Sequence, residues 1–228
     1  MRMLIVGQGK TGRVVTEIAR ERGHSVQTLE EKENKDAGWL TAPSLASFDV
    51  VVDFTTPEAV VQNLRACLVN GAKVVVGTTG WYQHLDDMRA LAARKDAGLL
   101  YSTNFSFGVQ LLYQIAKLLG NQAGGYQFKI DETHHITKLD SPSGTALTLQ
   151  QVLSTTPYGA SATVDAHRVQ DAIGTHRLEV SSENERIVVE HQALSRRSFA
   201  YGAVRGAEWL ATRAGCYDFQ DVFPQILG

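Results

Sequence analysis

Long apolar runs are missing from this sequence of 228 residues. No segment approaches the ~18 unbroken apolar residues of a membrane-spanning helix. The first apolar run, Met3–Val6, ends in a glycine turn instead of continuing into the core of a signal peptide. We therefore expect a cytoplasmic protein with no membrane partner.

The chain also has few cysteines and a small net charge. The chain has two cysteines, too few for a disulfide framework, and Cys67 falls in the apolar stripe of a predicted helix. The 22 Lys and Arg residues against 24 Asp and Glu residues give a net charge of -2. Because there is no long basic run and little aromatic interleaving, we exclude nucleic acid as a partner.

Short apolar runs alternate with helical patterns over the first hundred residues. The runs are Met3–Val6, Val26–Leu29, Val50–Phe54, Lys73–Val76 and Gly98–Tyr101. Apolar residues recur at helical spacing between most of them, and a charged loop extends to Ser44. This alternation predicts an α/β fold with a doubly wound, parallel sheet of the Rossmann type.

The pattern changes after Gly125. Tyr126, Phe128 and Ile130 alternate with polar residues, which is the period of a half-buried strand. The runs 178–180 and 187–189 look similar, so we predict a smaller α+β domain with an open mixed sheet. Ala203, Ala207, Leu210 and Ala211 indicate a last amphipathic helix.

The glycine turn Gly7–Gly12 has the form G-x-G-x-x-G, follows the first strand and opens the first helix. This is the fingerprint of a dinucleotide-binding site. Glu30 lies near the ~20-residue offset at which an acidic residue binds the adenosine ribose. Glu30 and Glu31 would repel a 2′-phosphate, whereas Lys10 or Arg13 would attract one. We predict NADH as the preferred cofactor and leave NADPH open.

Two further polar turns lie at the carboxyl ends of the fourth and fifth predicted strands, the edge on which open α/β sheets bind ligands. The predicted cofactor-binding residues are therefore Gly7, Gln8, Gly9, Lys10, Thr11, Gly12, Glu30, Gly77, Thr78, Thr79, Ser102, Thr103, Asn104 and Phe105.

The stretch 132–145, ETHHITKLDSPSGT, combines three chemical groups. His134 and His135 end a predicted strand and point to opposite faces, so they disfavour a shared metal site, and we predict no metal. Lys138 follows His134 by four residues, which brings the two together if the chain turns helically. Asp140–Thr145 has the form of a capped helix start with donors for an anion. A histidine that titrates near neutral pH, a cation and an anion-binding turn suit a small carboxylate substrate.

This stretch, extended to Ala146, resembles the signature of the dihydrodipicolinate (4-hydroxy-tetrahydrodipicolinate) reductase family of bacterial diaminopimelate and lysine biosynthesis. Further matches lie along nearly the whole chain. They are the N-terminal glycine turn, Asp53–Thr55, Gly77–Gly80, Asn104–Ser106, Gly174 with His176, Ser195–Arg196 and Phe199–Ala203.

The resemblance implies reduction of a cyclic, unsaturated imine dicarboxylate to tetrahydrodipicolinate by hydride from NADH or NADPH. It assigns His134 as the acid/base residue and Lys138 as a second proton donor or charge stabiliser. The substrate carboxylates are then held by His135, Ser143, Gly144 and Thr145.

The resemblance also implies a domain organisation and an assembly. Residues 1–105 and 202–228 form a discontinuous dinucleotide-binding domain, because the last helix returns to it. Residues 106–201 form the substrate-binding and oligomerisation domain, and the assembly is a homotetramer.

The chain departs from the family pattern at three places. Arg168-Val169-Gln170 stands where the family has Arg-Gly-Gly, the connection from Thr155 to Asp165 is short, and the glycine turn is one residue shorter than the commoner form. Substrate-loop detail, subunit packing and the pyrophosphate contacts therefore stay open, as does the point at which the substrate loses water.

Two other functions stay open at this point. One is a nicotinamide-dependent dehydrogenase acting on an amino or hydroxy acid, such as aspartate or homoserine. The other is a non-catalytic protein that senses the cofactor. The intact His134, His135 and Lys138 argue against both.

Overall fold

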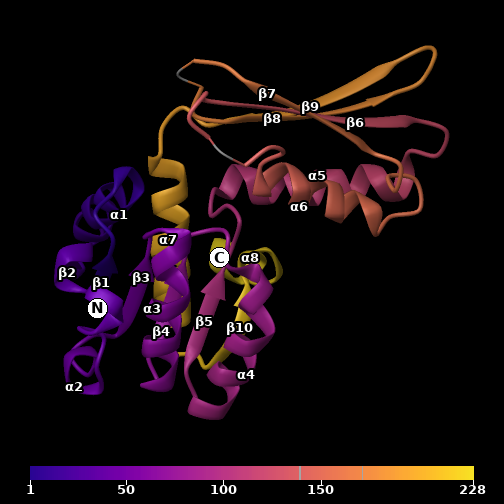
Figure 1. Cartoon of the computed structure of the whole chain (residues 1–228). Coiled ribbons are helices and arrows are strands. Elements are labelled where there is room, and N and C mark those ends of the chain that lie inside the picture. Colours follow the sequence, from indigo (N-terminus) through magenta and orange to yellow (C-terminus); the bar gives the residue numbers. More distant parts are fainter. Residues whose placement is uncertain (139, 171) are drawn as a thin grey trace. The chain divides into compact units, whose positions relative to one another are not determined.

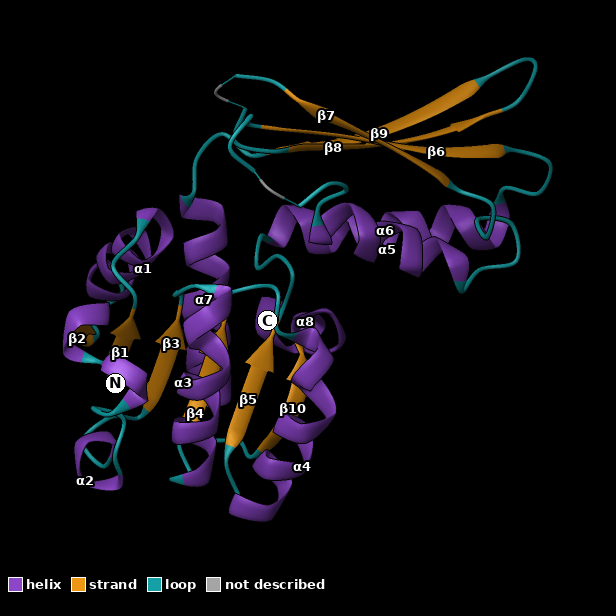
Figure 2. Cartoon of the chain, viewed as in Figure 1, coloured by secondary structure: helices purple, strands orange, loops and turns teal. Residues whose placement is uncertain are grey.

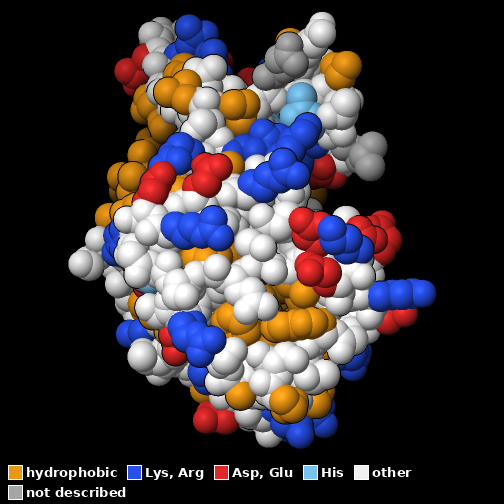
Figure 3. Space-filling model, turned by 90° about the vertical axis from the view of Figure 1, so that its left-hand side faces the viewer, with side chains coloured by type: hydrophobic (Ala, Val, Ile, Leu, Met, Phe, Trp, Pro, Cys, Tyr) orange, Lys and Arg blue, Asp and Glu red, His pale blue; other side chains and the backbone are white. Residues whose placement is uncertain are grey.

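The computed structural model describes residues 1–138, 140–170 and 172–228, which divide into two compact units (Figure 1). Unit 1 contains residues 1–105 and 199–228, and unit 2 contains residues 106–198. On the face drawn in Figure 3, acidic and basic side chains are interspersed, and neither sign covers it alone. None of the helices in the described ranges is long and apolar enough to span a membrane.

Unit 1 is built on a six-stranded, fully parallel sheet with the order β10-β5-β4-β3-β1-β2. Its strands are β1 (Arg2–Val6), β2 (Ser25–Leu29), β3 (Val50–Asp53), β4 (Lys73–Val76), β5 (Gly98–Tyr101) and β10 (Gly215–Asp218). The longer helices are α1 (Lys10–Glu21), α3 (Pro57–Val69), α4 (Leu85–Lys95), α7 (Arg197–Leu210) and α8 (Phe219–Leu227). The order reverses around β1, and such a switch point opens a crevice at the carboxyl ends of the strands.

Helices cover both faces of this sheet, as Figure 2 shows. On one face, Val51 and Leu99 share a buried core with Leu64 of α3. On the other face, α7 lies so close to β5 that a Cβ on Gly206 would be 2.7 Å from the Leu100 side chain. The strands are continuous apolar runs because both of their faces are buried.

Several elements of unit 1 were not predicted. The helix with Ala203 and Ala207 is not the last one, because β10 and α8 follow it. The four residues of β10 are all half-buried and pair only with β5, so an edge strand of this length leaves no periodic signal. The predicted loop before Ser44 also contains η1 (Glu31–Glu33), η2 (Lys35–Ala37) and the start of α2 (Ala42–Leu45).

Unit 2 is a four-stranded mixed sheet with the order β7-β6-β8-β9. The strands are β6 (Gln127–His134), β7 (Thr163–Arg168), β8 (Thr175–Ser181) and β9 (Arg186–Gln192). The helices are α5 (Phe107–Gln122) and α6 (Gly144–Ser154). β7 begins inside the predicted connection from Thr155 to Asp165, continues to Arg168 and runs parallel to β6. The predicted fold class, a parallel Rossmann-type sheet plus a smaller mixed-sheet α+β domain, is confirmed.

Helices α5 and α6 pack on one face of the unit 2 sheet (Figure 2). Ile130 of β6 and Leu178 of β8 contribute to this core, with Leu149 of α6. The opposite face carries polar residues such as Lys129 and Asp131, which form an ion pair of 2.9 Å. One helix-covered face and one uncovered face are typical of an open sheet and explain the alternating sequence pattern.

Candidate active site

The carboxyl end of β6 places two functional groups on one face of the unit 2 sheet. Glu132 and His134 are two residues apart, so both point toward the helix-covered side, where they are 0% and 7% exposed. His135 lies just beyond the end of the strand and is half-buried. The sequence prediction that the two histidines have separate environments agrees with this placement.

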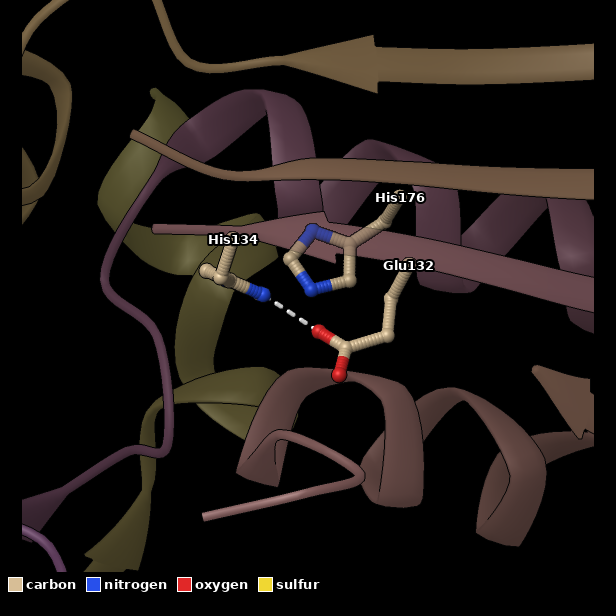
Figure 4. Close-up of side chains that lie close together, drawn as sticks. All are labelled: Glu132, His134 and His176. Carbon is tan, nitrogen blue, oxygen red and sulfur yellow. Dashed lines mark ion pairs between the residues drawn. The ribbon is translucent and has the colours of Figure 1, made fainter. Parts of the chain in front are cut away.

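Glu132 is held by three groups from three different elements. Its Oε1 accepts hydrogen bonds from Ser143 N–H at 3.1 Å and from the Arg168 guanidinium at 2.9 Å. Its Oε2 forms a close ion-pair contact with His134 Nδ1 (Figure 4). Burial would raise the pKa of Glu132, but these three partners outweigh it and lower the pKa to about 2. The carboxylate is therefore ionised at neutral pH, although it is buried.

His176 completes the cluster from the neighbouring strand β8, where it is the register partner of Glu132. Its Nε2 is hydrogen-bonded to Ser143 Oγ at 3.2 Å, and its ring packs edge-on against that of His134 with centroids 5.1 Å apart. Burial, assisted by the charge of His134, lowers the pKa of His176 to about 3. This histidine is therefore neutral and supports the site by packing and hydrogen bonding.

The two edges of the His134 ring face different neighbours. Its Nδ1 faces Glu132. On the opposite side, a Cβ added to Gly174 would lie 2.9 Å from His134 Nε2. A residue without a side chain at position 174 therefore lets the backbone pack closely against the Nε2 edge.

The start of α6 provides the predicted anion-binding turn. Ser143 caps the helix by accepting a hydrogen bond from Ala146 N–H at 3.2 Å. Asp140 accepts from Gly144 N–H at 3.3 Å and forms an ion pair of 2.7 Å with Lys138 Nζ. Burial would raise the pKa of Asp140, but Lys138 and the backbone donors lower it. A carboxylate therefore already lies between an ammonium group and a helix-start amide.

The other predicted residues lie in the same segment. The chain turns after β6 without forming a helix, with Lys138 N–H donating to the carbonyl of His135 at 3.1 Å. The His135 ring is 2.8 Å from the Thr137 hydroxyl. Thr145 is buried, and its carbonyl accepts from Tyr113. All six predicted catalytic and substrate-binding residues thus belong to the connection between β6 and α6 and its two ends.

The ligand atoms of Glu132, His134 and His176 lie within 4.8 Å of one another, a composition found in metal sites. The Arg168 guanidinium already binds the carboxylate of Glu132. A second cation at this carboxylate would be repelled by Arg168, so we assign no metal here.

The glycine turn of unit 1 borders a cavity of about 340 Å³. A Cβ on Gly12 would lie 1.9 Å from the Gly7 carbonyl oxygen, whereas a Cβ on Gly9 would have nothing within 4 Å. The turn is therefore tightly packed on one side and open at Gly9. These features fit a dinucleotide whose pyrophosphate approaches the backbone and the start of α1.

The predicted cofactor residues are distributed unevenly around this cavity. Gly7, Gln8, Gly9 and Glu30 line it, together with Arg13 and Glu31. Lys10 and Thr11 begin α1 outside this lining. Neither the Gly77–Thr79 turn nor Ser102–Phe105 contributes to it. The Thr78 hydroxyl instead donates to the buried Asp53, and the Ser102 hydroxyl donates to the carbonyl of Asn104.

Two family models match the chain and together cover nearly all of it. The model described as dihydrodipicolinate reductase, N-terminus, matches residues 1–105, and the one described as dihydrodipicolinate reductase, C-terminus, matches residues 108–223. The chain belongs to the dihydrodipicolinate reductase family. It is therefore an oxidoreductase with an NAD(P)H-binding domain, as predicted.

Relatives of known function agree with this membership. The 4-hydroxy-tetrahydrodipicolinate reductase of Christiangramia forsetii is 32% identical over 99% of both chains. That of Natronomonas pharaonis is 35% identical over 97% of this chain and 99% of its own. The dipicolinate-bound dihydrodipicolinate reductase of Paenisporosarcina sp. TG-14 shares the fold, with a TM-score of 0.76, 23% identity and coverage of 97% and 99%. The predicted 4-hydroxy-tetrahydrodipicolinate reductase activity is thereby confirmed.

From the sequence, we assigned no role to three residues that surround His134. They are Glu132, His176 and Arg168. Glu132 could have been found, because it precedes His134 by two residues and a strand places both on one face. His176 entered only as part of a family match, and Arg168 only as part of a departure. Both reach the site through the pairing of β6 with β7 and β8, for which the sequence has no local signal.

Replacing Glu132 tests its buried charge. We expect Glu132→Gln to lower the free energy of unfolding at pH 7 by about 2 kcal/mol, because bonds to an ionised group are lost. The folded pKa lies below the ordinary value, so this stabilisation is complete above pH ~4.5 and disappears as the pH falls toward 2. Urea unfolding at pH 7 and at about pH 3 would therefore show a shrinking difference from the unmodified protein.

The exposed Glu190 of β9 provides the matched control. Glu190→Gln should change the free energy of unfolding by less than about 0.5 kcal/mol at both pH values. A difference for Glu132→Gln that stayed constant with pH would contradict the role of the ionised carboxylate.

Proposed function

We propose that this reductase binds its cyclic dicarboxylate substrate in unit 2, at the start of α6, and protonates it from His134. The observation that carries the proposal is the ion pair between the buried Glu132 and His134, because the same carboxylate also binds the backbone at the start of α6. In this proposal unit 1 is the dinucleotide-binding domain, and unit 2 binds the substrate and forms the oligomer.

Substrate carboxylates would be held by donors that the structure already pairs with a carboxylate. Lys138 Nζ and Gly144 N–H both bind Asp140 in the free chain. A substrate carboxylate of the same charge would replace Asp140 at these donors, while the Thr145 hydroxyl and His135 hold the second carboxylate. Ser143 contributes by capping α6 and thereby fixing the direction of its first amides.

His134 supplies the proton. The nicotinamide cofactor, when bound, supplies a hydride to the unsaturated ring, which leaves negative charge on the substrate until a proton arrives. His134 Nε2 can donate this proton, because its Nδ1 is engaged by Glu132 and an imidazolium is stabilised by that carboxylate. Lys138 offers a second positive charge near the carboxylates.

Glu132 acts as a positioning residue in this mechanism. It orients the imidazole through Nδ1 and is itself fixed by Arg168 and by the first turn of α6. A carboxylate behind a histidine holds the imidazole in one orientation and one tautomer, as in other acid/base pairs. The acid and the carboxylate-binding turn are therefore oriented by one side chain.

The first test measures oxidation of NADH with substrate generated in situ from pyruvate and aspartate semialdehyde by the preceding synthase. We expect His134→Gln to lower turnover by roughly 10²–10⁴-fold, because a positioned acid contributes on that scale. The dissociation constant for NADH should be little changed, since His134 belongs to unit 2.

The matched control is His167→Gln, which alters an exposed histidine of β7 and should retain normal turnover. Near-normal turnover in His134→Gln would remove this residue from the mechanism. If the unmodified chain bound NADH but did not oxidise it with this substrate, the function would be wrong although the fold is right.

We further propose that NADH is preferred over NADPH. Glu30 and Glu31 both line the cavity beside the glycine turn, where a 2′-phosphate would meet their charge. Arg13 lines the same cavity, but its Nε already donates to the carbonyl of Gln8 at 2.9 Å. Steady-state kinetics should give a higher kcat/KM with NADH than with NADPH, and equal or higher efficiency with NADPH would overturn the preference.

The uncovered face of the unit 2 sheet is proposed to pair subunits in a homotetramer, as the family resemblance implies. On this face the edge strand β9 exposes Val188 at 41%, which a second copy would cover. Light scattering coupled to gel filtration should give about four times the 24.9 kDa of one chain. A mass of one chain would contradict this assembly.

A further inference from the structure

Unit 1 contains a second buried carboxylate, at the end of β3. Asp53 is 1% exposed. Its Oδ1 accepts from the Thr55 N–H, the Thr55 hydroxyl and the Thr78 hydroxyl at 3.1, 2.7 and 2.8 Å. Its Oδ2 accepts from Asn63 Nδ2 at 2.9 Å. Burial raises the pKa of Asp53, and these four donors oppose that rise.

A relay of side-chain amides extends from this carboxylate. Asn63 of α3 is 3% exposed, and its Oδ1 accepts a hydrogen bond of 2.9 Å from Asn34 Nδ2. Because Asn63 presents its amino group to Asp53, its oxygen must face Asn34. Asn34 must then present its own amino group to Asn63. The relay therefore fixes the orientation of both amides.

The relay ends at an acceptor without a donor. Asn34 is 8% exposed, and its Oδ1 is buried with no hydrogen-bond partner among the described residues. Leaving a buried acceptor unpaired is unfavourable, and turning the amide would place two oxygens against each other. Asn34 and Asn63 both line the cavity beside the glycine turn. A ligand in this cavity that brings a donor would satisfy the unpaired oxygen.

The position of Asn34 indicates which part of a dinucleotide it would meet. Its backbone N–H donates to the carbonyl of Glu30 at 3.2 Å, so it lies one turn beyond the predicted ribose-binding residue. The lining of the cavity also includes Phe54 and Ala59, whose apolar surfaces suit a flat base. Because Glu30 is the predicted acceptor for the ribose hydroxyls, the unpaired oxygen of Asn34 is left for the base.

We propose that Asn34 Oδ1 accepts a hydrogen bond from the exocyclic amine of the cofactor's adenine and makes the site selective for this base. The proposal rests on the nicotinamide cofactor of the proposed function. It adds a base-reading residue to the glycine turn and Glu30, which bind the phosphates and the ribose.

The probe is NADH against its hypoxanthine analogue, in which the amine at position 6 is replaced by a carbonyl oxygen. Binding is measured by fluorescence titration without substrate. The unmodified chain should bind NADH about 10-fold more tightly, because one hydrogen bond is lost and two acceptors oppose each other with the analogue. Asn34→Leu should weaken the binding of NADH about 10-fold and leave the binding of the analogue nearly unchanged. The ratio of the two affinities should then be close to one.

The affinity for the analogue reports whether the cavity is intact in Asn34→Leu. The matched control is Asn70→Leu. Asn70 caps the C-terminus of α3, and its side-chain amide donates to the carbonyls of Leu40 and Ala66. This variant should keep the 10-fold ratio.

Three outcomes would overturn the proposal. The unmodified chain binds both dinucleotides equally, or it binds neither, or Asn34→Leu leaves the ratio of the two affinities unchanged; an equal loss of both affinities indicates a structural role only. Loss of reductase turnover alone would leave the proposal standing, since the measurement is of binding.

Discussion

The site in unit 2 depends on the buried charge of Glu132. A carboxylate with no access to water is unfavourable unless its oxygens are paired, and here His134, Ser143 and Arg168 pair them. These partners come from β6, from the start of α6 and from the end of β7. Since each element must be in place for the charge to be satisfied, the positions of His134 and of the start of α6 are fixed together.

The buried carboxylate of Asp53 in unit 1 is also fully paired by hydrogen bonds, but its pKa is raised instead of lowered. Its donors are hydroxyls, one backbone amide and one side-chain amide, and none is a cation. Burial consequently keeps the pKa of Asp53 raised, whereas the contacts of Glu132 with His134, Ser143 and Arg168 outweigh its burial and bring its pKa to about 2. Asp53 orients dipoles along the wall of the cavity beside the glycine turn, while Glu132 orients the His134 ring.

Much of this organisation could be predicted from the sequence, because it rests on local patterns. Apolar runs, the glycine turn and the capped start of α6 each depend on neighbouring residues. The strand β10 and the placement of Arg168 and His176 depend on pairing between distant segments. The helical turn suggested by the spacing of His134 and Lys138 did not form, because Lys138 closes a tighter turn onto His135 and binds Asp140.

The departure at Arg168-Val169-Gln170 shows which parts of a motif carry its function. The Arg168 guanidinium keeps its bond to Glu132. Val169 contributes through its backbone, whose N–H donates to the carbonyl of His134 at 2.8 Å. Val169 does not have the positive φ that favours glycine, and its side chain is 52% exposed. Any residue with a backbone N–H can make this contact, so replacing glycine here leaves the support of His134 intact. Gly174 differs, because a side chain there would meet the His134 ring at Nε2.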